Sequence, residues 1–107
     1  MEVIYHKDVA EYLNELVDVL YHKEYFGFKD AAYDYVDWIF EQIESSIHKM
    51  HKKVAPKYFD RYGQRLFYVV YKRNAHTSWY VFFQKQEDTY LIRYIGNNHN
   101  CAQYILL

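Results

Sequence analysis

The spacing of apolar residues changes once along this chain, near Gly63, and this change limits the possible folds more than any other feature. Before Gly63, apolar residues recur every three or four positions, as in amphipathic helices. After Gly63, segments rich in Tyr, Val, Phe and Ile alternate with short polar connections, as in strands. Helices followed by strands predict an α+β domain.

The first half of the chain predicts two antiparallel helices. Asp8 and Glu11 have the spacing of a capping box, at the start of a helix over residues 8–22. A second, longer helix begins at Asp30. It should end before Pro56, because the residue ahead of a proline is pushed out of helical geometry.

The strands are expected at both ends of the chain. Glu2–Tyr5 is a short strand candidate, and Arg65–Arg73, Ser78–Gln84 and Thr89–Ile95 are joined by connections of hairpin length. The prediction is an N-terminal strand, a two-helix hairpin and an antiparallel three-stranded meander in one mostly antiparallel sheet. The helices cover one face, and the other face is open to solvent or a ligand. Residues 1–107 form a single domain.

Alternation along the last strand predicts which side chains share a face of the sheet. Tyr90, Ile92 and Tyr94 point one way, and Thr89, Leu91, Arg93 and Ile95 point the other way. Since an unpaired buried guanidinium is costly, we expect Arg93 to avoid the face that the helices cover. After this strand, 96–100 is predicted to be a polar turn that leads into an apolar end.

Tyrosine dominates the composition. The 14 tyrosines reconcile 51% hydrophobic residues with a mean hydropathy of −0.47, because a tyrosine counts as apolar while carrying a hydroxyl. We therefore expect an aromatic-rich core with many tyrosine rings partly exposed. The sequence contains neither an apolar run long enough to span a membrane nor the pattern of a signal peptide. A soluble cytoplasmic protein is therefore expected. The single cysteine, Cys101, cannot form an internal disulfide, which agrees with a reducing compartment.

Charge is divided unevenly along the chain. Residues 8–44 hold ten acidic residues and two lysines, whereas residues 48–73 hold eight basic residues and one aspartate. The basic stretch is a candidate contact for phosphate or for an acidic partner, the alternative being an ordinary solvated surface. The candidate nucleic-acid-binding residues are Lys52, Lys53, Lys57, Arg61, Arg65, Lys72 and Arg73.

Three residues near the C-terminus have side chains suited to chemistry on phosphate. Arg93 offers a fixed fork of donors, His99 exchanges protons near neutral pH, and Tyr104 can stack on a base or donate a proton. The alternative for His99 and Tyr104 is structural: a hydrogen-bonded histidine in a turn and a tyrosine that packs.

Other constellations are weaker. His48 and His51 have i, i+3 spacing, but no third ligand is evident and neighbouring lysines repel a cation, so no metal site and no cofactor are predicted. Cys101 with His99 could form a nucleophile and base, but a small core cysteine is the simpler interpretation.

The order of elements, together with "SWYVFFQKQEDTYLIRYIGNNH" from Ser78 to His99 and the short tail, resembles the RelE/ParE superfamily of toxins from bacterial type II toxin–antitoxin modules. The architectural resemblance covers nearly the whole chain, and its sequence-specific part lies in about the last forty residues. It implies metal-independent cleavage of ribosome-associated mRNA, by attack of a ribose 2′-hydroxyl on the adjacent phosphate. The alternative that it implies is a ParE-like inhibitor of DNA gyrase, or an antitoxin-binding domain without catalysis.

The same resemblance assigns roles to residues. Lys72 and Arg73 match basic residues of the first meander strand, Arg93 matches the arginine of the last strand, and His99 and Tyr104 match the C-terminal His/Tyr group. Arg93 and Arg73 would stabilise charge on the phosphorane, and His99 or Tyr104 would move protons. The partners implied are a cognate antitoxin and the ribosome with its mRNA, or gyrase. The chain departs from the family pattern at Trp79 and Tyr80, where many active members carry an arginine.

Overall fold

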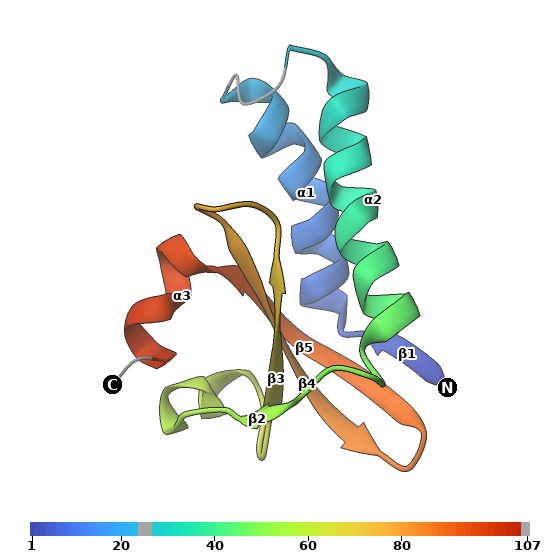
Figure 1. Cartoon of the computed structure of the whole chain (residues 1–107), viewed down its shortest axis with the longest axis vertical. Coiled ribbons are helices and arrows are strands. Elements are labelled where there is room, and N and C mark those ends of the chain that lie inside the picture. The colour runs from blue at the N-terminus through green and yellow to red at the C-terminus, as the bar shows by residue number, and fades with distance from the viewer. Residues whose placement is uncertain (24–26, 106–107) are drawn as a thin grey trace.

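The computed structural model describes residues 1–23 and 27–105, so Glu24, one of the ten acidic residues, and the apolar end 106–107 lie outside the described part. The fold is α+β, as predicted (Figure 1). Its elements are β1 (Glu2–Tyr5), α1 (Lys7–His22), α2 (Lys29–Ser46), β2 (Lys53–Val54), the 3-10 helix η1 (Lys57–Tyr62), β3 (Phe67–Lys72), β4 (Ser78–Gln86), β5 (Thr89–Asn97) and α3 (Asn98–Ile105).

All strands belong to one mixed sheet with the order β1-β5-β4-β3-β2. The expected meander is confirmed, since β3, β4 and β5 pair antiparallel in sequence. β1 pairs parallel with the first half of β5, from Glu2 opposite Thr89 to Tyr5 opposite Ile92. The second half of β5 therefore extends beyond β1, and α1 starts beside it.

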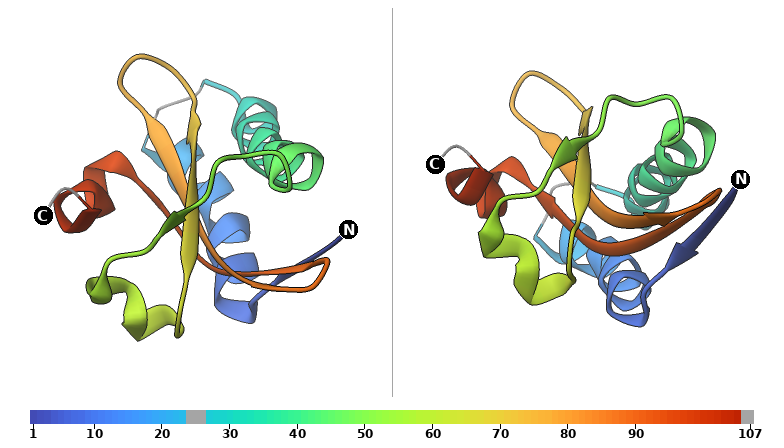
Figure 2. Two further views of the ribbon diagram at one scale, coloured as in Figure 1. Left: turned by 60° about the horizontal axis from the view of Figure 1, so that its bottom comes forward. Right: turned by 90° about the horizontal axis from the view of Figure 1, so that it is seen from below.

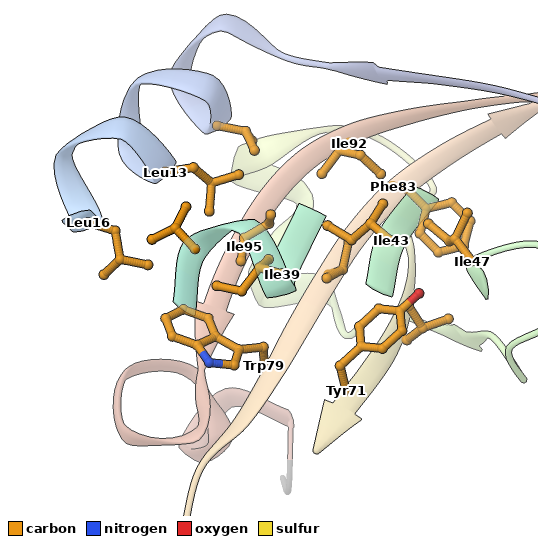
Figure 3. Close-up of a cluster of buried hydrophobic side chains, with 14 of the residues drawn as sticks. Leu13, Leu16, Ile39, Ile43, Ile47, Tyr71, Trp79, Phe83, Ile92 and Ile95 are labelled. Atoms are coloured by element: carbon orange, nitrogen blue, oxygen red, sulfur yellow. The ribbon is translucent and has the colours of Figure 1, made fainter. Parts of the chain in front are cut away.

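The helix pair covers one face of this sheet and forms the larger core (Figure 3). Apolar residues at helical spacing, such as Leu13 on α1 and Ile39 and Ile43 on α2, are at most 1% exposed. They pack against the alternating residues of β4 and β5, including Phe83 and Ile92. In this core, the helical layer comes from residues before Gly63, and the strands β3, β4 and β5 on which it packs come from residues after Gly63.

The opposite face is not open, so that expectation is wrong. The 3-10 helix η1 and the C-terminal helix α3 lie against it (Figure 2) and form a second, aromatic cluster. Phe59 of η1 is fully buried and stacks on Phe82 of β4, with ring centroids 4.2 Å apart. Because aromatic rings lie on both faces of the sheet, both faces are buried by packing against helices.

A bulge in β5 changes the expected alternation. Phe82 lies opposite Tyr94 and Phe83 lies opposite Ile92, so Arg93 is an extra residue in the ladder. Tyr94 consequently packs in the aromatic cluster while Ile92 lies in the larger core. The prediction that Tyr94 and Ile92 share a face is therefore wrong. So is the prediction that Ile95 lies on the face of Arg93, because Ile95 is in the larger core.

The start of α1 differs from the capping-box prediction. The N-cap is His6, whose Nδ1 accepts a hydrogen bond of 3.1 Å from the backbone N–H of Asp8. Asp8 lies in the first turn, where its carboxylate faces the positive end of the helix dipole.

The second helix ends at Ser46, well before Pro56. The hydroxyls of Ser45 and Ser46 donate hydrogen bonds of 2.6 Å to the carbonyls of Glu41 and Gln42. Such bonds compete with the backbone pattern and weaken a helix end. The residues between this end and β3 are thereby left to form β2 and η1, which the sequence analysis did not predict.

The predicted turn at 96–100 is instead the end of β5 and the start of α3. Asn97 Oδ1 accepts hydrogen bonds from the N–H groups of His99 and Asn100, and Asn100 Oδ1 accepts one from the N–H of Asn97. This is a reciprocal cap made by asparagines. Asn98 fixes the helix to the β3–β4 hairpin through the N–H of Ser78 and the carbonyl of His76.

Candidate functional site

Arg93 is held by η1. As the extra residue of the bulge, it points away from the helix pair, as expected, and its Nε donates a hydrogen bond of 2.9 Å to the carbonyl of Tyr62. Gly63 makes room for it, because a Cβ atom there would lie 3.2 Å from Arg93 Nε. The guanidinium is therefore fixed in position on the aromatic side of the sheet.

Arg61 is held by the same short helix. Its Nε donates a hydrogen bond of 3.0 Å to the carbonyl of Tyr58, and its Cζ lies 3.8 Å from the centre of the Tyr58 ring. In both arginines the Nε–H group is thus used for anchoring. Within residues 1–23 and 27–105, neither Arg61 nor Arg93 forms an ion pair.

Both arginines line one pocket of about 450 Å³, at the end of β5 that β1 does not cover. The N-terminal end of α1 closes its other side with His6 and Asp8. Asp8 is the one carboxylate that lines this pocket among the described residues, and it is 81% exposed. Two arginines against one solvated carboxylate make the pocket a candidate site for an anion.

His6 is a residue of this pocket that the sequence analysis missed. Because its Nδ1 accepts the N–H of Asp8, the neutral ring carries its proton on Nε2. Among the described residues that line the pocket, it is the one imidazole. Its only sequence signal is a histidine directly before a helix, which is too common to indicate a site.

Two stacked phenols complete the wall of the pocket. The rings of Tyr62 and Tyr94 lie 3.9 Å apart at an angle of 8°. Burial, together with the neighbouring Tyr62, raises the pKa of the Tyr94 hydroxyl well above its ordinary value. The Tyr94 hydroxyl therefore stays neutral near pH 7 and can donate a hydrogen bond.

His99 and Tyr104 do not join Arg93 in this pocket. His99 lines a second pocket of about 570 Å³, bounded by α1, α2 and the β3–β4 hairpin. Tyr104 lines neither pocket and stacks on Tyr58, with ring centroids 3.6 Å apart. Asn100 and Tyr12 border both pockets.

All seven residues predicted to bind nucleic acid are exposed: Lys52, Lys53, Lys57, Arg61, Arg65, Lys72 and Arg73. They do not lie on one face. The Arg73 guanidinium lies 4.6 Å and 4.9 Å from the rings of Tyr35 and Trp38 on α2, whereas Arg61 lies on the side of η1. The basic residues therefore extend around the β2–β3 edge from one face of the sheet to the other.

Cys101 is placed as a core residue. Its side chain is 1% exposed, its Sγ donates to the carbonyl of Asn97, and burial raises the pKa of the thiol to about 12. A thiol with this pKa is not ionised near pH 7, which argues against a nucleophilic cysteine. Within the described residues, no group of three or more His, Cys, Asp or Glu side chains is arranged to hold a metal ion.

Comparison of the chain with protein-family models, curated proteins and solved structures found no match. In the described part of the chain, no helix is both long and apolar enough to cross a membrane.

Proposed function

We propose that this protein is the toxin of a bacterial type II toxin–antitoxin module of the RelE/ParE kind, and that it cleaves ribosome-associated mRNA without a metal. One observation carries the proposal: Arg61 and Arg93 line the same pocket, each anchored by its Nε to a carbonyl of η1. Their remaining guanidinium nitrogens are available to a phosphate, since no ion pair among the described residues occupies them.

The proposed reaction needs charge stabilisation and the transfer of one proton. The ribose 2′-oxygen attacks phosphorus, the bond from phosphorus to the 5′-oxygen breaks, and a proton moves from the attacking hydroxyl to the leaving oxygen. Arg61 and Arg93 stabilise the charge that gathers on the phosphorane, in the manner of preorganised oxyanion donors. His6 lines the same pocket, and we assign to it the transfer of this proton from the attacking 2′-hydroxyl to the leaving 5′-oxygen.

The exposed basic residues support binding of a long polyanion. Contacts from these residues to RNA phosphates would hold the strand around the β2–β3 edge, while the pocket takes one phosphodiester. The cognate antitoxin fits the same surface: an acidic, amphipathic tail would offset the entropy of its ordering by contacts to the basic residues.

Inducible expression in a bacterial host tests the proposal. The wild-type chain should arrest growth, and Arg93→Ala should relieve the arrest. Lys85→Ala is the matched control, since it removes one charge from an exposed residue of β4 outside the pocket and should arrest growth as the wild type does. If wild-type expression leaves growth unchanged, or if Arg93→Ala arrests growth equally, the catalytic proposal is wrong.

A second candidate is a non-enzymatic domain, either a ParE-like gyrase inhibitor or a protein that binds only its antitoxin. It is favoured by the separation of His99 and Tyr104 from the arginine pocket. Inhibition of DNA supercoiling by purified protein, with ribosome-bound mRNA left intact, would favour this candidate over the nuclease.

A further inference from the structure

Three side chains form a stack at the edge of the arginine pocket. Tyr104 of α3 and Tyr58 of η1 lie with ring centroids 3.6 Å apart and ring planes 4° from parallel. The Arg61 guanidinium lies 3.8 Å from the same Tyr58 ring. Because one face of a ring cannot hold both neighbours at these distances, Tyr104 and Arg61 occupy opposite faces of Tyr58.

Tyr58 fixes Arg61 at two points, through its ring and through its carbonyl, which accepts the Nε–H bond of 3.0 Å. Arg61 is otherwise exposed, and a solvated arginine side chain has many rotamers. A guanidinium that stacks on a ring and donates to a carbonyl keeps one orientation. The position of Arg61 in the pocket therefore depends on how firmly Tyr58 is held.

Among the described residues, Tyr104 is the ring contact of Tyr58 that comes from another element. The Tyr58 ring also meets Phe59 edge-on at 5.0 Å, but Phe59 is the next residue of the same helix, whereas Tyr104 comes from α3. The side-chain bonds of Asn98 to the β3–β4 hairpin fix the start of α3, so Tyr104 approaches from a helix with its own anchor. Figure 2 shows α3 and η1 close together beside the sheet.

We propose that Tyr104 is a positioning residue whose ring, through Tyr58, fixes the Arg61 guanidinium in the pocket. This inference depends on the function proposed above, and it replaces the role in proton transfer that the family resemblance implies for Tyr104. The Tyr104 side chain does not line the arginine pocket. Hydrogen bonding to Tyr58 also raises the pKa of the Tyr104 hydroxyl, which makes it a weaker acid.

Two substitutions separate the ring from the hydroxyl. Tyr104→Phe loses the hydroxyl contact with Tyr58 but keeps the ring stack, and it should cleave ribosome-bound mRNA at nearly the wild-type rate. Tyr104→Ala removes the stack, and kcat should fall roughly tenfold, the upper range for a stacked aromatic pair, with KM little changed. Equal losses in Tyr104→Phe and Tyr104→Ala would show that the hydroxyl is what matters and would overturn the proposal.

A spectroscopic readout tests the positioning without any assay of activity. The Nε–H of Arg61 is bonded to the Tyr58 carbonyl, so it should give a protected NMR signal. This signal should remain in Tyr104→Phe and broaden or shift in Tyr104→Ala. The Nε–H of Arg93, bonded to the Tyr62 carbonyl, is the internal control and should not change. An unchanged Arg61 signal in Tyr104→Ala would show that Tyr104 does not position Arg61. If the NMR signals behave as expected but the wild-type protein does not cleave mRNA, only the nuclease function is rejected.

Discussion

Two histidines line neighbouring pockets in the fold, but only one of them shares a pocket with Arg93. His6 lines the pocket with Arg61 and Arg93, while His99 lines the neighbouring pocket. The resemblance to the toxin superfamily implies the second of these as the proton-transfer residue. The geometry favours the first, because a general acid or base must come within hydrogen-bond reach of the atom that it serves.

Replacement of each histidine tests this difference. His6→Gln should lower the cleavage rate of ribosome-bound mRNA by about 10²-fold, the low end for a general acid–base residue, whereas His99→Gln should change it little. Single-turnover rates on the same substrate check this. His6 also caps α1, so thermal unfolding of His6→Gln is the necessary control for a loss of folded protein. A large loss in His99→Gln alone would return the role to His99.

At the scale of elements, the junction between β5 and α3 depends on Gly96. A Cβ atom there would lie 2.9 Å from Asn100 Oδ1 and 3.0 Å from the Tyr94 hydroxyl oxygen. Gly96→Ala should therefore disturb the asparagine cap of α3 and lower the free energy of unfolding by about 1–3 kcal/mol. Urea-induced unfolding of the variant and the wild type measures this difference.

Gly27→Ala is the matched control for this substitution. A Cβ atom at Gly27 has no atom within 4 Å, so its replacement should leave the free energy of unfolding within about 0.5 kcal/mol of the wild type. Equal stability of the Gly96→Ala and Gly27→Ala variants would contradict the account of the α3 cap.

Most of the elements that were predicted from the sequence have a repeating apolar pattern. α1, α2 and the strands β3, β4 and β5 were expected because each presents several apolar residues at a fixed period. The short strand β1 was also predicted, and its bounds Glu2–Tyr5 are confirmed. β2 has two residues, and η1 buries a single apolar residue, Phe59, so neither shows a repeating apolar pattern. The first turn of α3 consists of asparagines and a histidine, which are residues typical of turns, so their role as a cap is visible only in three dimensions.

The same limit applies to the candidate site. Arg93 and Arg61 were named from the sequence, but the bulge that directs Arg93 toward η1 has no sequence signal. His6 is 87 residues before Arg93 in the chain, and only the parallel pairing of β1 with β5 brings it to the pocket. Long-range pairing of this kind is not encoded in local spacing.

At the scale of the whole molecule, tyrosine burial makes stability depend on pH. Burial raises the pKa of Tyr12 from 10.0 to about 12, and raises that of several other tyrosines, among them Tyr5 and Tyr94. A raised pKa in the folded state stabilises the fold below the unfolded pKa, and this contribution is lost as pH increases through the folded value. Stability should therefore fall between about pH 10 and pH 12.

Circular dichroism and phenolate absorbance, followed together during an alkaline titration, check this prediction. The absorbance change of the buried phenols should coincide with the loss of circular dichroism, because these hydroxyls ionise as the chain unfolds, whereas exposed tyrosines such as Tyr33 ionise without unfolding. Full ionisation of the tyrosines near pH 10 with the circular dichroism unchanged would contradict their burial.

The division of charge predicts a shared surface for RNA and antitoxin. Lys52→Glu, Lys53→Glu and Lys57→Glu combined should weaken binding of both partners, with the fold unchanged because all three side chains are exposed. Titrations at low salt against RNA and against an acidic antitoxin-tail peptide measure this. If both affinities remain unaltered, the basic stretch is an ordinary solvated surface.

Single-turnover cleavage of ribosome-bound mRNA by the purified protein tests whether the pocket of Arg61 and Arg93 binds and cleaves an RNA phosphodiester. We expect fragments that end in a 2′,3′-cyclic phosphate and begin with a 5′-hydroxyl. Arg61→Ala and Arg93→Ala should each slow the reaction by about 10²–10³-fold, and Lys85→Ala should not slow it. Absence of cleavage by the wild-type protein, or equal rates in the two arginine variants and the Lys85 control, would contradict this role of the pocket.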